Sequence, residues 1–273
     1  MIGPQHRRIA ASIPVLLRRG GAAAEASLLE QNALLFANSM TSPDFDLKNV
    51  KIPTNKFPIA LRGVASSFAP VWEHVIVPDM PSWVTAFLRD VVCGQILHRP
   101  FMYADGAIVA WYNLALARWA SNDRVGPDGA LYHLARCCHL IQDLSIPHHT
   151  TVFGNIKEVY NALLEKSSIQ TAYENYCNQQ YTMSSGTYNL AEYSGITLPA
   201  FLINEANATR GNMYLCDGIT LPSWLRNSIF RDLLYKLNKA WKEDFYTVAQ
   251  YSNSTAEKNS VLLVHKFFRD VNF

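Results

Sequence analysis

The chain has little net charge and no long apolar run. Its 24 Lys and Arg residues nearly balance its 22 Asp and Glu residues, so the formal net charge at pH 7 is +2. This balance argues against a broad binding surface for polyanions such as nucleic acids. The most apolar stretch, near residues 84–97, is interrupted by Arg89 and Asp90. The sequence therefore predicts no membrane-spanning helix, which needs about eighteen or more consecutive apolar residues.

Several common functional motifs are also missing. The sequence contains no glycine-rich phosphate loop, no Gly-x-Ser-x-Gly nucleophile elbow, no internal repeat and no heptad run. Its five cysteines form neither a disulfide framework nor the paired spacing of a zinc finger. Alternation of β-branched residues is short wherever it occurs. Because this alternation is short, the sequence excludes an all-β or α/β fold.

A hydrophobic and largely helical pattern remains. Hydrophobic residues make up 49% of the 273 residues and charged residues 17%, which is typical of a well-buried globular protein. We predict an all-α fold in which residues 1–273 form a single compact multi-helix domain. The main irregular segment is expected at residues 41–81, which are rich in Pro, Asn and Ser. The expected helices span about residues 5–19, 22–39, 82–97, 103–121, 127–145, 154–182, 198–210, 222–249 and 257–270, with Pro127 and Asp128 opening the fifth.

The N-terminal segment has two interpretations. Residues 1–24 contain no Asp or Glu but carry four arginines among small and apolar residues, which is typical of a mitochondrial transit peptide. They lack the uninterrupted apolar core and cleavage site of a secretory signal. The same residues also predict an amphipathic helix, with Ile9, Ile13, Leu16 and Leu17 on one face. We favour the structural helix, and the transit segment stays open as the alternative.

The most informative motif runs from His139 to His149. His139 and Asp143 are four residues apart, so a helix places them on one face, one turn apart. Pro147 ends that helix, which leaves His148 and His149 close to the helix end. Zinc is bound by imidazole nitrogen and carboxylate oxygen, so the segment predicts half of a zinc site. The alternative is a helix C-terminus at which these side chains only cap and balance charge.

This segment resembles the core of the zinc-dependent phospholipase C family, which is related to the fungal zinc single-strand nucleases. In that family a helix carries His-x-x-x-Asp, followed by a proline and by a ligand histidine six residues after the aspartate. His139, Asp143, Pro147 and His149 reproduce that spacing. The resemblance implies an all-α fold of the phospholipase C and zinc single-strand nuclease type.

The resemblance implies four further metal ligands in other parts of the chain. His6 matches the ligand in the first turn of the family's opening helix. Asp44 lies in a Pro-Asp-aromatic sequence that the family uses as a loop. His74 follows a glutamate and precedes a second Pro-Asp pair, and we favour it over its rival His98. Glu174 matches the acidic residue of a His-x-x-x-Glu helix.

Two departures weaken the match. Gln170 stands where the family has the histidine of that last helix, and a neutral amide is a poorer zinc ligand than imidazole. The family's mature chain begins with a tryptophan whose amine and carbonyl bind one ion, whereas this sequence begins with Met1 and Ile2. The family pattern is three zinc ions, and we expect fewer here. A catalytically impaired member of the family is one alternative.

The resemblance also implies a ligand set and a reaction. It implies a first zinc held by His74, His139, Asp143 and Asp44, a second held by His149 and Glu174 with Gln170 contributing weakly if at all, and a third held by His6, Asp143 and the chain start. Clustered zinc ions activate water and stabilise the charge that develops during phosphodiester cleavage. Asp44 is also the candidate general base, because a carboxylate beside a metal-bound water can receive its proton.

The expected activity is that of a zinc-dependent phospholipase C. Such an enzyme cleaves a phospholipid at a membrane surface to diacylglycerol and a phospho-alcohol. A single-strand nuclease or nucleotidase is the alternative, and nucleic acid is a partner only in that case. The family resemblance implies secretion, although this chain shows no signal peptide, so an organellar or cytoplasmic location stays open. Oligomeric state is not predicted.

Each ligand candidate also has a simpler interpretation when it is taken alone. His6 is then an exposed N-terminal histidine, Asp44 a turn residue, and Glu174 a surface acid without a partner. The prediction of a metal site depends on their order along the chain and on their matching neighbours.

Overall fold

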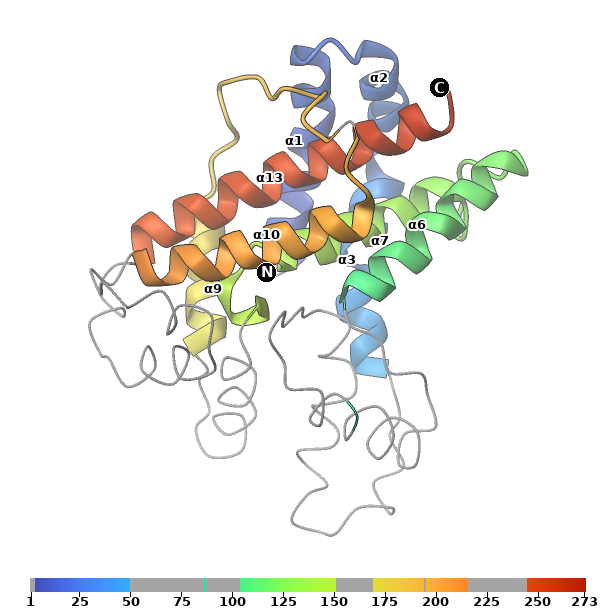
Figure 1. The fold of residues 1–273 in the computed structure, drawn as a ribbon. Helices are drawn as coiled ribbons and strands as arrows, with labels where there is room; N and C mark the ends of the chain where they lie inside the picture. Colours follow the sequence, from blue (N-terminus) through green and yellow to red (C-terminus); the bar gives the residue numbers. More distant parts are fainter. Residues whose placement is uncertain (1–2, 50–85, 87–103, 151–168, 194, 216–244) are drawn as a thin grey trace, which may run out of the picture.

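The computed structural model describes residues 3–49, 86, 104–150, 169–193, 195–215 and 245–273 (Figure 1). Every regular element within these ranges is a helix, so the prediction of an all-α fold is confirmed. None of these helices combines the length and the apolar character needed to cross a membrane. The elements are α1 (Gly3–Arg19), α2 (Ala23–Gln31), α3 (Ala33–Asn49), α6 (Ala104–Ala120), α7 (Ala130–Asp143), the short 3₁₀ helix η5 (Pro147–Thr150), α9 (Ile169–Gln180), α10 (Leu198–Leu215) and α13 (Phe245–Asp270).

Helix α7 lies at the centre of the described structure. It packs against α3, α6 and α13, and His6 of α1 contacts its residues His139 and Gln142. Helices α10 and α13 run alongside each other (Figure 1). Buried residues occur on every side of α7, as expected for a helix enclosed by other helices. Three polar residues, His139, Gln142 and Asp143, are among them, with exposed fractions of 0%, 0% and 1%. Polar groups buried this deeply need hydrogen-bond partners. These three side chains and their partners form the candidate site.

Helix α7 begins later than predicted. We expected Pro127 and Asp128 to form its first turn, but the helix starts at Ala130 with Gly129 as the N-cap. The first free N–H groups of α7 already have acceptors in the preceding turn, because Ala130 N donates to the carbonyl of Asp123 at 2.9 Å and Leu131 N to that of Arg124 at 3.1 Å. The expected helix at 82–97, apart from residue 86, lies outside the described residues. So do residues 154–168 of the expected helix 154–182 and residues 222–244 of the expected helix 222–249.

The amphipathic N-terminal helix is confirmed as part of the core. Ile9, Ile13, Leu16 and Leu17 are each 0% exposed, and α1 packs against α2, α3, α9 and α13. Gly21, with φ of +93°, adopts the left-handed backbone that lets the chain turn after α1. The buried face of α1 also carries His6, which therefore points into the core.

The segment from residue 22 to 49 differs from the prediction of one helix followed by a loop. It forms two helices, α2 and α3, separated at Asn32, whose side-chain amide donates to the Leu28 carbonyl at 2.9 Å. A side chain that bonds the preceding turn in this way competes with the regular helix pattern.

Helix α3 then continues through Pro43 into residues 41–49, which we expected to be irregular. Pro43 has no N–H to donate to the carbonyl of Ser39. The hydroxyl of Ser42 donates to that carbonyl instead, at 2.8 Å, so the lost hydrogen bond is replaced. Asp44 consequently lies in a helix and not in the predicted loop. The rest of the predicted irregular segment, residues 50–81, lies outside the described residues.

Helix α13 is continuous where we expected a break at residues 250–256. The Ser- and Asn-rich sequence there has low helix propensity, but its side chains find partners on neighbouring helices. Asn253 donates to the Cys177 carbonyl of α9 at 2.9 Å. Glu257, 1% exposed, accepts hydrogen bonds from the hydroxyls of Tyr181 and Tyr188 at 2.6 and 2.9 Å. Tertiary contacts therefore outweigh local propensity in this helix.

Candidate metal centre

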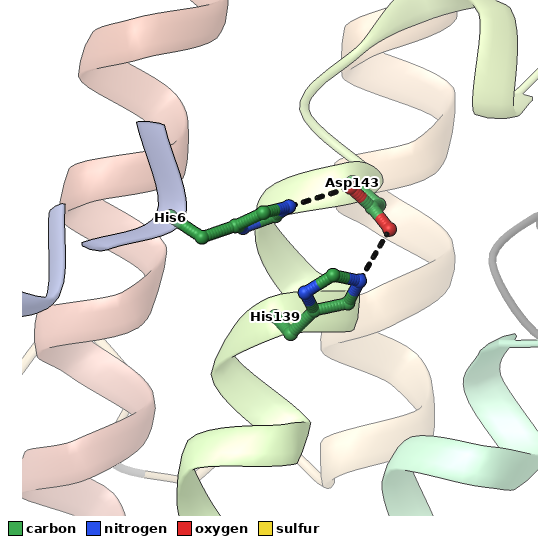
Figure 2. Close-up of side chains that lie close together, drawn as sticks. All are labelled: His6, His139 and Asp143. Atoms are coloured by element: carbon green, nitrogen blue, oxygen red, sulfur yellow. Dashed lines mark ion pairs between the residues drawn. The ribbon is translucent and has the colours of Figure 1, made fainter. Parts of the chain in front are cut away.

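Three of the predicted ligands meet in the interior of the protein. His6 comes from the first turns of α1, and His139 and Asp143 come from the C-terminal half of α7, one turn apart (Figure 2). Their ligand-type atoms all lie within 4.8 Å of one another. The two imidazole rings are stacked, with centroids 4.0 Å apart and planes at 26°. The close-up shows both rings directed at the Asp143 carboxylate.

The spacing of these atoms suits a metal ion. His6 Nε2 lies 3.5 Å from Asp143 Oδ1, and His139 Nε2 lies 3.2 Å from Asp143 Oδ2. Two ligands that each lie about 2.05 Å from one tetrahedral zinc are about 3.3 Å apart. Each carboxylate oxygen faces a different imidazole, so Asp143 is also shaped to bridge two positions. The group could therefore bind a metal ion.

The outer nitrogen of each ring is held by a carbonyl oxygen. His139 Nδ1 lies 2.7 Å from the backbone carbonyl of Met40 in α3, and His6 Nδ1 lies 2.7 Å from the side-chain Oε1 of Gln142. A carbonyl oxygen can only accept, so each Nδ1 must carry the hydrogen. A neutral ring then has its lone pair on Nε2, the nitrogen that faces Asp143. Metal-binding histidines are held by outer hydrogen bonds of this kind.

Without a cation, the Nε2 acceptors of the two neutral rings lie against the acceptor oxygens of the Asp143 carboxylate. The Nε2 lone pairs of neutral His6 and His139 both face carboxylate oxygens, and His6 Nε2 is buried without a hydrogen-bond partner. A proton on one ring relieves one contact, but protons on both would stack two imidazolium cations 4.0 Å apart. A divalent metal ion satisfies both rings and the carboxylate together. The donor set of two imidazoles and one carboxylate is typical of zinc.

The Asp143 carboxyl is held in its charged form. Burial alone raises the pKa of this group, but nearby basic groups in their protonated form, the His139 and His149 side chains among them, bring the pKa well below its ordinary value. A metal ion bound here would replace the proton on His139. A buried carboxylate that remains ionised offers a metal ion its full negative charge.

A second buried pair lies near the first group. His149 of η5 and Glu174 of α9 approach at 3.2 Å between Nε2 and Oε1, and both are 7% exposed. Burial raises the pKa of Glu174, but positive charge that includes His149 lowers it more, and the net shift is downward. The negative charge of Asp143, in contrast, raises the pKa of Glu174. The two carboxylates are therefore close enough to influence each other.

The simpler interpretations of two ligand candidates are wrong. His6 is not an exposed N-terminal residue, since it is 0% exposed, and Glu174 is not an unpaired surface acid. Their roles as ligands remain predictions.

The side chains of the other predicted ligands are not among those that the structure describes. His74 and its rival His98 fall within residues 50–85 and 87–103. Asp44 and Gln170 lie in α3 and α9, but their side chains are not among the described ones. In α9 the backbone places Gln170 one turn before Glu174, as the predicted His-x-x-x-Glu helix requires.

No protein-family model matches the chain, and no curated protein matches it.

The sequence did not predict the residues that accept hydrogen bonds from Nδ1 of His6 and His139. Gln142 is adjacent to Asp143, but its spacing carries no signal of a bond to α1, more than a hundred positions away. The Met40 carbonyl is a backbone group, which no residue pattern identifies. Ser260 of α13, which bonds Gln142 at 2.9 Å, is equally distant in sequence.

We predict that the purified protein binds zinc, with at least one and fewer than three ions per chain. The buried His6, His139 and Asp143 group supports binding, whereas Gln170 weakens the second site. Elemental analysis after dialysis measures the number. Loading with zinc at about a hundred times its dissociation constant should stabilise the fold by about 2.7 kcal/mol over the chelator-treated protein. A zinc-free protein, or one with three ions, would contradict this prediction in opposite directions.

We also predict that Gln170→His raises the zinc content and tightens zinc binding. The substitution places an imidazole one turn before Glu174, at the spacing at which two helix side chains can bind one ion. Gln179→His, on an exposed position of the same helix, is the matched control and should change neither quantity. Equal zinc content in the parent and in Gln170→His would show that residue 170 does not face the site.

Proposed function

We propose that this protein is a zinc-dependent phosphodiester hydrolase of the phospholipase C type. The observation that carries the proposal is the pair of buried imidazoles from two helices, each with its outer nitrogen bonded to a carbonyl and its inner nitrogen directed at one carboxylate. The family resemblance of the segment from His139 to His149 supports the choice of reaction.

The donor set fits the chemistry of phosphodiester cleavage. Zinc bound in such a site lowers the pKa of a water molecule toward 7 and neutralises charge on phosphate oxygens. His6, His139 and Asp143 would hold that positive charge in place, and the buried carbonyls that bind the two rings would limit reorganisation during the reaction. Asp143 has one oxygen toward each ring, so its loss removes the central ligand of the whole group.

The pair of His149 and Glu174 is the proposed second half of the site. Its position on η5 and α9, and the interaction of Glu174 with Asp143, support a second cation in the same region. Paired metal ions about 3.5–4 Å apart can hold both the attacking and the leaving oxygen of a phosphodiester. Asp44 is retained as the proposed general base.

A phospholipid is the substrate we propose. The net charge of +2 offers little to hold a polyanionic strand, whose binding depends on many Lys and Arg contacts. A single phosphodiester with a choline or ethanolamine headgroup needs no such surface, because the metal ions themselves supply the positive charge.

Parallel assays test this proposal. We expect the zinc-loaded protein to cleave phosphatidylcholine or phosphatidylethanolamine faster than single-stranded DNA or a 3′-nucleotide, and a chelator to stop the reaction. Asp143→Asn should reduce the rate at least about a thousand-fold, since it removes charge from a ligand that faces both imidazoles. Asp128→Asn is the matched control: its carboxylate lies 2.9 Å from His133 in another His–Asp pair, outside the site, and its loss should leave the rate unchanged.

The possible outcomes separate the alternatives. Faster cleavage of DNA or of the 3′-nucleotide would favour the nuclease. Zinc binding with no activity on any of these substrates would favour a catalytically impaired family member. Equal activity of Asp143→Asn and the parent would overturn the proposed site.

A further inference from the structure

Gln142 is a buried side chain that neither the motif nor the proposed reaction uses. It lies on α7 directly before Asp143 and is 0% exposed. Its Oε1 lies 2.7 Å from His6 Nδ1, and its Nε2 lies 2.9 Å from the hydroxyl of Ser260 in α13. The same Nε2 lies 3.2 Å from the sulfur of Met40 in α3. One carboxamide therefore contacts three other helices at the candidate metal centre.

The hydrogen bonds of Ser260 determine which way this carboxamide faces. The Ser260 hydroxyl donates its only hydrogen to the Ala256 carbonyl, at 2.7 Å. It can therefore only accept from Gln142, so the group of Gln142 that faces it must be the NH₂. The Met40 sulfur, a weak acceptor, also requires the NH₂ on that side. The oxygen of Gln142 is left to face His6.

The direction of the hydrogen bond to His6 follows from this orientation. Because the Gln142 oxygen accepts, His6 Nδ1 donates, and the lone pair of the neutral ring lies on Nε2. That nitrogen faces Asp143 Oδ1 at 3.5 Å. The chain of bonds from the Ala256 carbonyl through Ser260 and Gln142 thus sets both the hydrogen position and the ring orientation of His6.

We propose that Gln142, oriented by Ser260, is a positioning residue that holds the His6 imidazole with its Nε2 lone pair directed at the metal position. The inference rests on the proposed metal centre but not on the hydrolase activity. His139 is held differently, by a backbone carbonyl that no substitution removes. Gln142 is therefore the point at which a side-chain change weakens one imidazole ligand and leaves the other in place.

Zinc affinity of three variants tests this inference. Gln142→Leu removes the acceptor while keeping a similar volume, and we expect its zinc affinity to fall about 10-fold to 100-fold, as for other outer contacts of metal ligands. Gln142→Glu keeps an oxygen that can accept from His6 and should stay within about three-fold of the parent or bind more tightly. Ser260→Ala removes the bond that orients the amide, and we expect an intermediate loss.

The control separates positioning from a general loss of stability. Tyr181→Phe removes another buried hydrogen bond, the one between the Tyr181 hydroxyl and Glu257. It should lower the melting temperature but leave zinc affinity unchanged. Affinities come from competition with a chromophoric chelator, and the visible spectrum of the cobalt-substituted protein reports the coordination geometry, which should change in Gln142→Leu and not in Tyr181→Phe.

Each outcome decides the inference. Zinc affinity of Gln142→Leu within two-fold of the parent would overturn it and leave the hydrolase proposal standing. If Gln142→Leu does not fold, equal affinities of Ser260→Ala and the parent, or a large loss in Gln142→Glu, would overturn it in the same way. A parent protein that binds zinc but cleaves no substrate would remove the hydrolase proposal and leave the inference intact. A parent that binds no zinc would overturn both.

Discussion

The structure depends on one buried carboxylate placed between two imidazoles. Asp143 lies on the most enclosed helix of the described structure and is 1% exposed, so its charge cannot be relieved by water. Burying a charge of this kind is costly unless a partner compensates for it. The two rings that face it are themselves held by carbonyl oxygens, and a metal ion bound between them could satisfy all three side chains together.

Four helices contribute the side chains of this group and the contacts that hold them. α7 supplies one imidazole and the carboxylate, and α1 supplies the second imidazole. The outer contact of His139 comes from the Met40 carbonyl of α3. That of His6 comes from Gln142 of α7, which Ser260 of α13 orients. α9, which carries Glu174, is joined to α1 by Arg8, whose guanidinium donates to the Asn178 carbonyl of α9 and, at 2.6 Å, to the Tyr181 carbonyl that follows α9. A metal ion at the centre would connect α1 to α7, so we expect the stability of the helix packing and the occupancy of the site to depend on each other.

Sequence patterns predicted those features of the site that depend on residues within a few positions of each other. The four-residue spacing of His139 and Asp143 and the apolar face of α1 both follow from helix periodicity, and the structure contains both. The start of α7 and the passage of α3 through Pro43 were predicted wrongly. In the first case the Asp123 carbonyl accepts from the N–H of Ala130 at the helix start. In the second the Ser42 hydroxyl donates the hydrogen bond that Pro43 lacks. The bond between Gln142 and His6 joins distant helices, and no periodic pattern contains it.

The most direct test of the account is the position of the metal ion itself. Crystals of the zinc-loaded protein, measured on both sides of the zinc absorption edge, give an anomalous difference map. We predict a peak about 2.0–2.2 Å from Nε2 of His6 or His139 and from an oxygen of Asp143, with Nδ1 of each ring still bonded to its carbonyl. A zinc peak at any other place, or a group of His6, His139 and Asp143 without one at saturating zinc, would contradict the account.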